Sequence, residues 1–249
     1  MITSIRLELY KFKKQKHVNV VLCGTIVFYF LMVALTIFKP GYFEKKLMVE
    51  NSFSTLQFLP LIIMIFASEL MSAEFRLGTI KNLIVTSKSR LQIIASKFIF
   101  LLIIILSLFL GILLLDIFIS FFIFQESIQS TIMKYTLLWV FGTAIETLLL
   151  GSLVFFLSII FKNPAIPVTI GVLVYLLVGL VDGMNFHLIS KLKFLRWNVL
   201  NLLNFKAQLI DHSLQNYTKL SLTDFSIGIS LYIIFFLMTS YVVFRDKTI

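Results

Sequence analysis

Three carboxylate side chains lie inside long apolar stretches of the chain, where an ionisable group is costly and often marks a functional site. Glu69 lies near the end of one stretch, Asp116 lies within another, and Glu146 lies near the middle of a third. If Asp116 and Glu146 sit at similar depths on adjacent antiparallel helices, they could line a path for a cationic substrate or carry protons. The alternative interpretation is structural: each acid is protonated, or accepts hydrogen bonds from Ser, Thr or backbone groups of a neighbouring helix.

A second candidate is a basic segment at residues 74–90, EFRLGTIKNLIVTSKSR, which separates two apolar stretches. Its charged residues are one acid, Glu74, and four bases, Arg76, Lys81, Lys88 and Arg90. Ile80, Leu83 and Ile84 share one face of a helix, because residues three and four apart are neighbours on a helix. Such a helix either lies flat on lipid headgroups or places one face in a groove of a partner protein. The spacing alone leaves both interpretations open.

The elements that position these residues are membrane-spanning helices. Hydrophobic residues make up 59% of the 249 residues and charged residues only 14%, which lies outside the range of water-soluble domains. The apolar blocks have the length that a helix needs to cross ~30 Å of hydrocarbon, which cannot hydrogen-bond to the backbone. The sequence therefore predicts an all-α polytopic membrane protein, a single transmembrane domain over residues 1–249. Its six transmembrane helices are predicted at about 18–38, 54–72, 98–124, 135–161, 165–181 and 225–244.

Residues 1–17 predict an additional amphipathic helix on the membrane surface, because apolar positions recur at helical spacing among basic residues. Six spans place both termini on one side of the membrane. Five Lys or Arg residues lie in the N-terminal segment and five at 73–97, against three at 39–53 and one at 125–134. The positive-inside rule therefore predicts that both termini and residues 74–90 lie in the cytoplasm.

Residues 182–224 fit this orientation less well, because a predicted extracellular loop here carries five Lys or Arg residues. Apolar and basic positions alternate at helical spacing, which predicts short helices in the outer interface before the last span. Longer loops weigh less in setting topology, so the orientation is kept. The formal net charge is +10, and the Lys and Arg residues lie between the spans. We therefore interpret this charge as setting the membrane orientation and contacting lipid headgroups, and we predict no nucleic acid partner.

Motifs for catalysis and cofactor binding are absent from the sequence. It contains no G-x-x-x-x-G-K-[ST] loop for ATP, no H-E-x-x-H zinc motif and no G-x-S-x-G nucleophile motif. His17, His187 and His212 are scattered, and the single cysteine, Cys23, allows neither an intrachain disulfide nor a cysteine metal site. We therefore predict no catalytic residue, no metal site and no cofactor bound by this chain. Transport against a gradient would take its energy from a partner or an ion gradient.

The basic segment resembles the first cytoplasmic loop of the permeases of type 2 ABC exporters. The shared pattern is an acid, a Gly-Thr pair, an apolar helical turn, a Ser-Arg pair and a lysine opening the next span. Here these positions are Glu74, Gly78, Thr79, Ser89, Arg90 and Lys97. The resemblance extends over the whole topology, from the N-terminal amphipathic helix to the outer helices before the last span. Family members often have a proline shortly before the Ser-Arg pair, and this chain has none there.

The resemblance implies that residues 74–90 form a coupling helix that docks on a nucleotide-binding ATPase subunit, which holds ATP and magnesium. The residues it assigns to coupling are Glu74, Gly78, Thr79, Ile80, Leu83, Ser89 and Arg90. It also implies a second permease, identical or a sister chain, with the substrate path between the two and Asp116, Glu146 and Glu69 as candidates for its lining. The chain would then be a non-catalytic subunit of an ATP-driven exporter in a bacterial cell membrane.

Small stand-alone permeases of this kind resemble exporters of amphipathic or antimicrobial peptides, including those of bacteriocin immunity and toxin-peptide export. A Phe-rich path, in a chain with 27 Phe residues, would suit a hydrophobic or amphipathic peptide. The alternative function is a gradient-driven carrier or channel with Asp116 and Glu146 as ion sites, which internal inverted repeats would favour. An intramembrane protease would need paired acids and histidines within spans, and the sequence lacks both.

Overall fold

The computed structural model describes residues 2–14, 16–86, 89–122 and 130–247. Within these ranges the chain forms helices and no strand, and six helices are long and apolar enough to cross a membrane. These are α2 (Lys16–Phe38), α4 (Leu59–Leu77), α6 (Arg90–Phe122), α7 (Ser130–Ile160), α8 (Ala165–Lys191) and α12 (Leu222–Asp246). The predicted all-α membrane fold with six spanning helices is confirmed.

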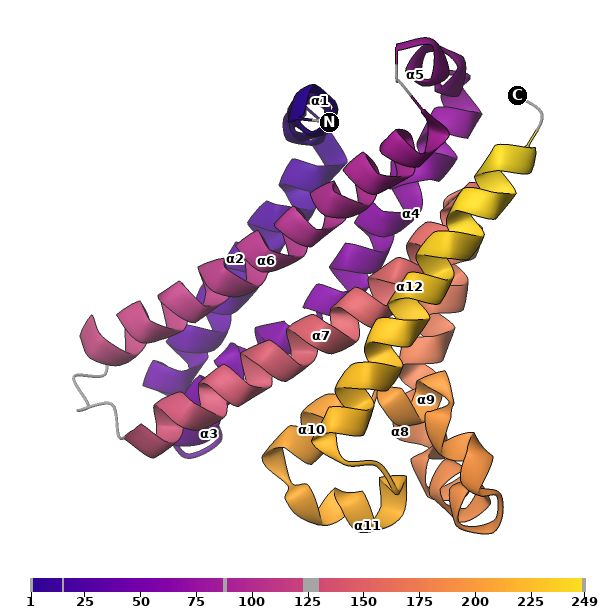
Figure 1. The fold of residues 1–249 in the computed structure, drawn as a ribbon. Coiled ribbons are helices and arrows are strands. Elements are labelled where there is room, and N and C mark those ends of the chain that lie inside the picture. The colour runs from indigo at the N-terminus through magenta and orange to yellow at the C-terminus, as the bar shows by residue number, and fades with distance from the viewer. Residues whose placement is uncertain (1, 15, 87–88, 123–129, 248–249) are drawn as a thin grey trace.

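The shorter helices gather at the two ends of the bundle (Figure 1). One end, which we call the terminal end, holds α1 (Ile2–Lys14), α5 (Ile80–Thr86) and the C-terminus. The opposite, distal end holds α3 (Lys45–Glu50), η1 (Ser52–Gln57) and a segment between α8 and α12. That segment contains η2 (Lys193–Trp197), α9 (Val199–Leu202), α10 (Phe205–Ile210), η3 (His212–Leu214) and α11 (Gln215–Thr218). Both termini and the basic segment thus share one end of the bundle.

Helix α7 lies at the centre of the bundle. It packs against α4, α6, α8, α10 and α12, and its side chains Leu149, Val154 and Phe155 are completely buried. By contrast, little of α2 and α8 is buried, and many of their exposed side chains are large and apolar. In water these faces would promote aggregation, whereas in a bilayer they contact hydrocarbon or a second membrane protein. The chain is therefore a multi-pass membrane protein built around α7.

The turn from α4 into α5 depends on a glycine. Gly78 ends α4 in the left-handed conformation, with a φ of 69°, where a side chain is disfavoured. Beyond it Ile80 is buried, and Leu83 and Ile84 are half-buried against the core, so the predicted apolar face is the inner face of α5. Residues 87–88, which include Lys88 of the predicted segment, lie outside the described residues.

Two helix boundaries differ from the sequence-based prediction. Helix α4 begins at Leu59, because Ser52, Phe53 and Ser54 have left-handed backbone and η1 precedes the helix. Helix α8 continues to Lys191, so Asp182, expected just past the fifth span, lies inside a helix. The predicted end of the third span, at 123–124, lies outside the described residues. Where the bilayer surfaces cross these helices stays a prediction.

In the distal segment between α8 and α12, side-chain amides donate hydrogen bonds to backbone carbonyl groups and hold the short helices together. Asn201 donates hydrogen bonds to two backbone carbonyls, at 2.7 and 3.1 Å, and Gln208 donates to the carbonyl of Leu220 at 2.8 Å. Leu202 and Phe205 are buried. The short helices expected here are present, and they pack against α7 and α8.

Candidate functional site

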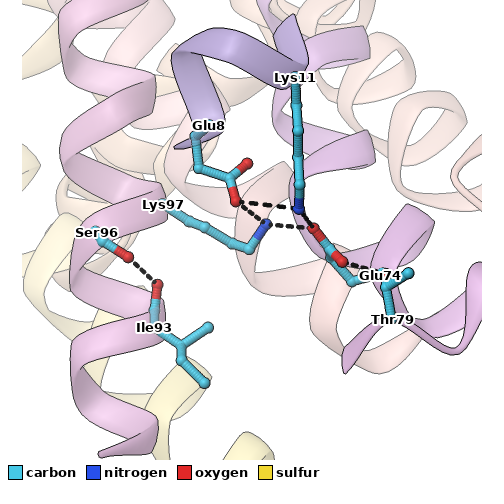
Figure 2. A network of polar contacts seen from close by, with 7 residues as sticks. All are labelled: Glu8, Lys11, Glu74, Thr79, Ile93, Ser96 and Lys97. Atoms are coloured by element: carbon cyan, nitrogen blue, oxygen red, sulfur yellow. Dashed lines mark hydrogen bonds and ion pairs between the residues drawn. The ribbon is translucent and has the colours of Figure 1, made fainter. Parts of the chain in front are cut away.

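Four charged side chains form a buried network at the terminal end (Figure 2). Lys97 of α6 donates hydrogen bonds to Glu8 of α1, at 3.0 Å, and to Glu74 of α4, at 3.1 Å. Lys11 of α1 donates to the same Glu74 oxygen at 2.6 Å and lies 3.7 Å from Glu8. Thr79, at the α4–α5 turn, donates to the other Glu74 oxygen. The network therefore ties α1, α4 and α6 to the start of α5.

The charges in this network balance, since two carboxylates face two ammonium groups. Lys97 is only 1% exposed, and an unpaired charge at such a site would cost several kcal/mol. Phe12 closes the network from the side of α1, edge-on to Phe66 and Phe100 at centroid distances of 5.0 and 5.6 Å. One face of the N-terminal amphipathic helix is thus packed into the bundle, which fixes the geometry around Glu74.

Arg90, the first residue of α6, caps the end of α12. Its Nη1 donates hydrogen bonds to the carbonyl oxygens of Phe244, at 2.8 Å, of Lys247, at 3.4 Å, and of Arg245. The last carbonyls of a helix lack intrahelical partners and carry partial negative charge, so a cation is favourable there. Arg90 thus connects the basic segment to the sixth membrane helix.

Two further side chains join the terminal ends of α4, α7 and α12. Lys247, directly after α12, donates to two carbonyl oxygens at the end of α7, at 2.6 and 3.3 Å. Ser72 of α4 donates to two other carbonyls in the same region, at 3.1 and 2.7 Å. With Arg90, these contacts link α6 to α12, α12 to α7, and α7 to α4. A displacement of the α5–α6 connection would therefore reach four membrane helices.

Asp116 is buried between α6, α2 and the loop before α4. Its two oxygens accept hydrogen bonds from the hydroxyls of Tyr29, at 2.9 Å, and Ser52, at 2.6 Å. Phe53 packs edge-on against the Tyr29 ring, 5.2 Å between centroids. Of the two interpretations of this acid, the geometry favours the structural one. Asp116 holds α2 and the start of η1, where the backbone is left-handed, against α6.

We expect Asp116→Leu to destabilise the protein, because it leaves the Tyr29 and Ser52 hydroxyls buried without an acceptor, at about 1–3 kcal/mol each. Asp116→Asn is the matched control, since it keeps the shape and one acceptor oxygen while its NH2 group can donate to the other hydroxyl oxygen, so it should unfold at a clearly higher temperature than the Leu variant. Thermal unfolding of the purified chain in detergent measures both. Equal melting temperatures for the Asn and Leu variants would contradict the structural role.

Glu146 and Asp182 hold the turn between α9 and α10. Glu146 accepts a hydrogen bond from the backbone N–H of Lys206 at 2.8 Å, and its other oxygen lies 3.8 Å from the Lys206 ammonium. Asn204 donates to Asp182 at 2.8 Å. Since the first N–H groups of a helix lack intrahelical partners, the Glu146 carboxylate caps α10. It also lines a pocket of about 310 Å³ that Tyr175 shares.

The three predicted path acids do not form a common lining. Asp116 contacts α2 and the loop before α4, and Glu146 contacts α10. Glu69 lies at the terminal end, half-buried on α4, and lines a cavity of about 50 Å³ beside the charged network. Glu146, by contrast, borders a pocket of about 310 Å³, which is large enough for part of a substrate.

A comparison with known protein families identifies the family to which this chain is similar. Residues 4–179 match the model of a family described as ABC-2 family transporter protein. The match covers more than two thirds of the chain and includes α5, the charged network, Asp116 and Glu146. The chain belongs to the ABC-2 transporter family. ABC-2 permeases are the membrane subunits of ABC transporters, which work with an ATPase subunit. No curated protein matches the chain in a sequence search.

In this ABC-2 permease, most of the predicted coupling residues point inward. Glu74 and Ile80 are buried, Thr79 is bonded to Glu74, and Leu83 is half-buried against the core. Arg90 is engaged with the end of α12. Ser89 is exposed and accepts a hydrogen bond from the backbone N–H of Gln92 at 3.2 Å, so it caps α6. These residues position α5, and Gly78 lets the chain turn into it.

The outward surface of the coupling region consists of residues that the resemblance did not assign. Leu77 is 70% exposed and Val85 is 85% exposed, and Lys81 between them is also exposed. The spacing of four between Lys81 and Val85 places them on one face of α5, opposite the apolar face. That periodicity was available in the sequence, and it identifies the face that can contact another subunit.

Proposed function

We propose that this permease is the membrane subunit of an ATP-driven exporter, and that a separate nucleotide-binding ATPase subunit docks on α5. The observation that carries the proposal is the arrangement of α5. Its inner side is fixed by the network of Glu74 and Lys97, while Leu77, Lys81 and Val85 are exposed. The terminal end is then the cytoplasmic end in a bacterial cell membrane, and the ATPase subunit binds ATP and magnesium.

Force on α5 has two routes into the membrane helices. The network of Glu74 and Lys97 links the start of α5 to α1, α4 and α6. Arg90 links the other side of the basic segment to α12. When the ATPase subunits close on ATP, they push on α5, and both sets of contacts pass the movement to the membrane helices. The bundle then shifts from an inward-facing toward an outward-facing state.

The exported substrate is a hydrophobic or amphipathic molecule, and we assign it to the peptide class. The exposed apolar faces of α2 and α8 support an apolar path, because they offer surface to a second permease, identical or a sister chain. The substrate path would lie between the two permeases. The Glu146 pocket, about 310 Å³ and lined by one acid and the apolar Leu176 and Val178, suits a segment of an amphipathic peptide.

The docking proposal is tested by Leu77→Asp combined with Val85→Asp. Both side chains are exposed, so the variant should fold, yet two charges in a docking face should abolish co-purification of the ATPase from the native host. Tyr42→Asp is the control, because Tyr42 is 88% exposed in the connection between α2 and α3, away from α5. Retained complex and retained ATP hydrolysis in the double variant would overturn the docking site.

The substrate class is tested separately in inverted membrane vesicles that contain the assembled complex. A fluorescently labelled amphipathic peptide should accumulate inside only when ATP is present, and not with the docking variant. Intact complex that hydrolyses ATP without moving the peptide would reject the peptide assignment and leave the docking site standing.

A further inference from the structure

The distal end carries an open pocket that neither the coupling site nor the Glu146 pocket includes. Its volume is about 500 Å³, and it lies between the end of α8, η2, η3 and α11. Its lining is Ile189, Ser190, Lys193, Arg196, His212, Gln215, Asn216 and Lys219. Three lysine or arginine side chains and a histidine thus surround one space, and no acid lines it. We call it the distal basic pocket.

The positive charge of this pocket is not neutralised within the described part of the chain. No carboxylate lies within ion-pair distance of Lys193, Arg196 or Lys219 there. Two acids lie on neighbouring elements outside the lining and stay charged: Asp211 accepts from the Ser213 N–H at 2.9 Å, and Asp224 forms a capping box with Ser221 and also interacts electrostatically with Arg196. Three lysine or arginine side chains are thus set against two carboxylates. Hydrogen bonds from Ser213 hold the pKa of the Asp211 carboxyl below its usual range. The pocket therefore has net positive charge.

The backbone at Lys219 places a cation where a glycine or asparagine is usual. Lys219 ends α11 in the left-handed conformation, with a φ of 56°, a cost that Gly would avoid. The neighbouring Thr218 is buried and bonded to Gln208 at 2.6 Å, which holds the turn. The turn thereby places the Lys219 side chain at the pocket.

The surroundings of the pocket are apolar. Leu188, Leu192, Phe194 and Tyr217 lie on the elements that form it and are all exposed, Phe194 by 71%. Bases beside exposed apolar and aromatic side chains are typical of the zone where headgroups meet hydrocarbon. A ligand that fits both features carries an anionic group and an acyl chain.

We propose that the distal basic pocket binds the phosphate group of an anionic membrane lipid. Arg196 and the two lysines supply charge-assisted hydrogen bonds to phosphate oxygens, and Ser190, Gln215 and Asn216 supply partners for headgroup hydroxyls. The lipid chains lie along Leu192 and Phe194. The site is independent of the docking of the ATPase on α5, which lies at the other end of the bundle (Figure 1).

Calorimetric titration of the full chain in detergent tests the site with four probes: short-chain phosphatidylglycerol, short-chain phosphatidylcholine, inorganic phosphate and tetraglutamate. We expect phosphatidylglycerol to bind most tightly. Lys193→Gln combined with Arg196→Gln should lower that affinity by about tenfold or more, because charge-assisted hydrogen bonds are lost. The matched control is Lys46→Gln with Lys191→Gln, which removes two exposed charges outside the pocket.

Equal loss of affinity in the control would overturn the site, since it would show only a response to surface charge. Inorganic phosphate or phosphatidylcholine binding as tightly as phosphatidylglycerol would overturn the lipid assignment. Tetraglutamate binding more tightly than the lipid would replace it with an acidic peptide. The assay needs neither the ATPase subunit nor transport, so its outcome is separate from that of the proposed function.

Discussion

Lys97→Met should lower the free energy of unfolding by about 3–5 kcal/mol, the cost of removing one partner from a buried set of charges. The change leaves the carboxylates of Glu8 and Glu74 facing each other, with only the partly exposed Lys11 near both. Methionine fills the space of the lysine stem, so the loss comes from charge and not from a cavity. Thermal unfolding of the purified permease in detergent measures it, and the released α5 should also reduce co-purification of the ATPase subunit.

Lys46→Met is the matched control for that experiment, because Lys46 is exposed on α3, at the opposite end of the bundle from α5, and surface changes usually stay within about 0.5 kcal/mol. Adding Glu74→Gln to Lys97→Met removes one of the stranded charges, so the double variant should unfold at a higher temperature than the sum of the single effects predicts. A Lys97→Met protein that melts with the wild type would show that the network is not buried in the membrane-embedded state.

The sequence was sufficient for the six long apolar helices and for a short helix after Gly78. Apolar blocks long enough to cross the bilayer predict helices directly. Hydrocarbon cannot hydrogen-bond to the backbone, so the N–H and C=O groups must bond to each other within the helix. The apolar spacing of Ile80, Leu83 and Ile84 likewise predicts a short helix with one apolar face. The structure packs that face against the core of the bundle, instead of against lipid or a partner.

The direction of the functional side chains could not be predicted, because it depends on contacts between distant parts of the chain. Glu8 and Lys97 are 89 residues apart, and Arg90 reaches a carbonyl 154 residues away. Periodicity shows only that a residue lies on a helix face, whereas these partners depend on which helices pack together. The resemblance assigned Glu74, Thr79 and Arg90 to coupling, and in the structure these side chains hold the segment against the bundle.

The same limit applies to the intramembrane acids. Depth in an apolar block marked Asp116 and, more strongly, Glu146 as candidates, yet Asp116 is bonded to two hydroxyls and Glu146 caps a helix of the distal segment. The pairing of Glu146 with a backbone N–H of α10 could not be predicted, because no pattern in the sequence indicates that this segment reaches α7. What permits that approach is a missing side chain at Gly142.

Gly142→Ala should detach α10 from α7 and destabilise the permease by roughly 2–5 kcal/mol, combining overpacking with a lost buried hydrogen bond. A Cβ at this position would lie 2.8 Å from the Lys206 Cβ and 2.9 Å from its Cα. Because the obstacle includes backbone, no rotamer change relieves it, and α10 must move. The movement takes the Lys206 N–H away from Glu146, one helical turn along α7, and leaves that carboxylate buried without its partner. Thermal unfolding in detergent measures the loss.

Gly151→Ala provides the matched control, with the same substitution on the same helix. Its added Cβ would lie 3.5 Å from the nearest atom, a methyl of Leu101, which is ordinary contact. Alanine favours a helix over glycine by up to about 1 kcal/mol, so this variant should melt at or above the wild-type temperature. The opposite order, with Gly142→Ala the more stable protein, would mean that α10 does not rest on α7. Glu146 would then be free to serve the substrate path instead of the fold.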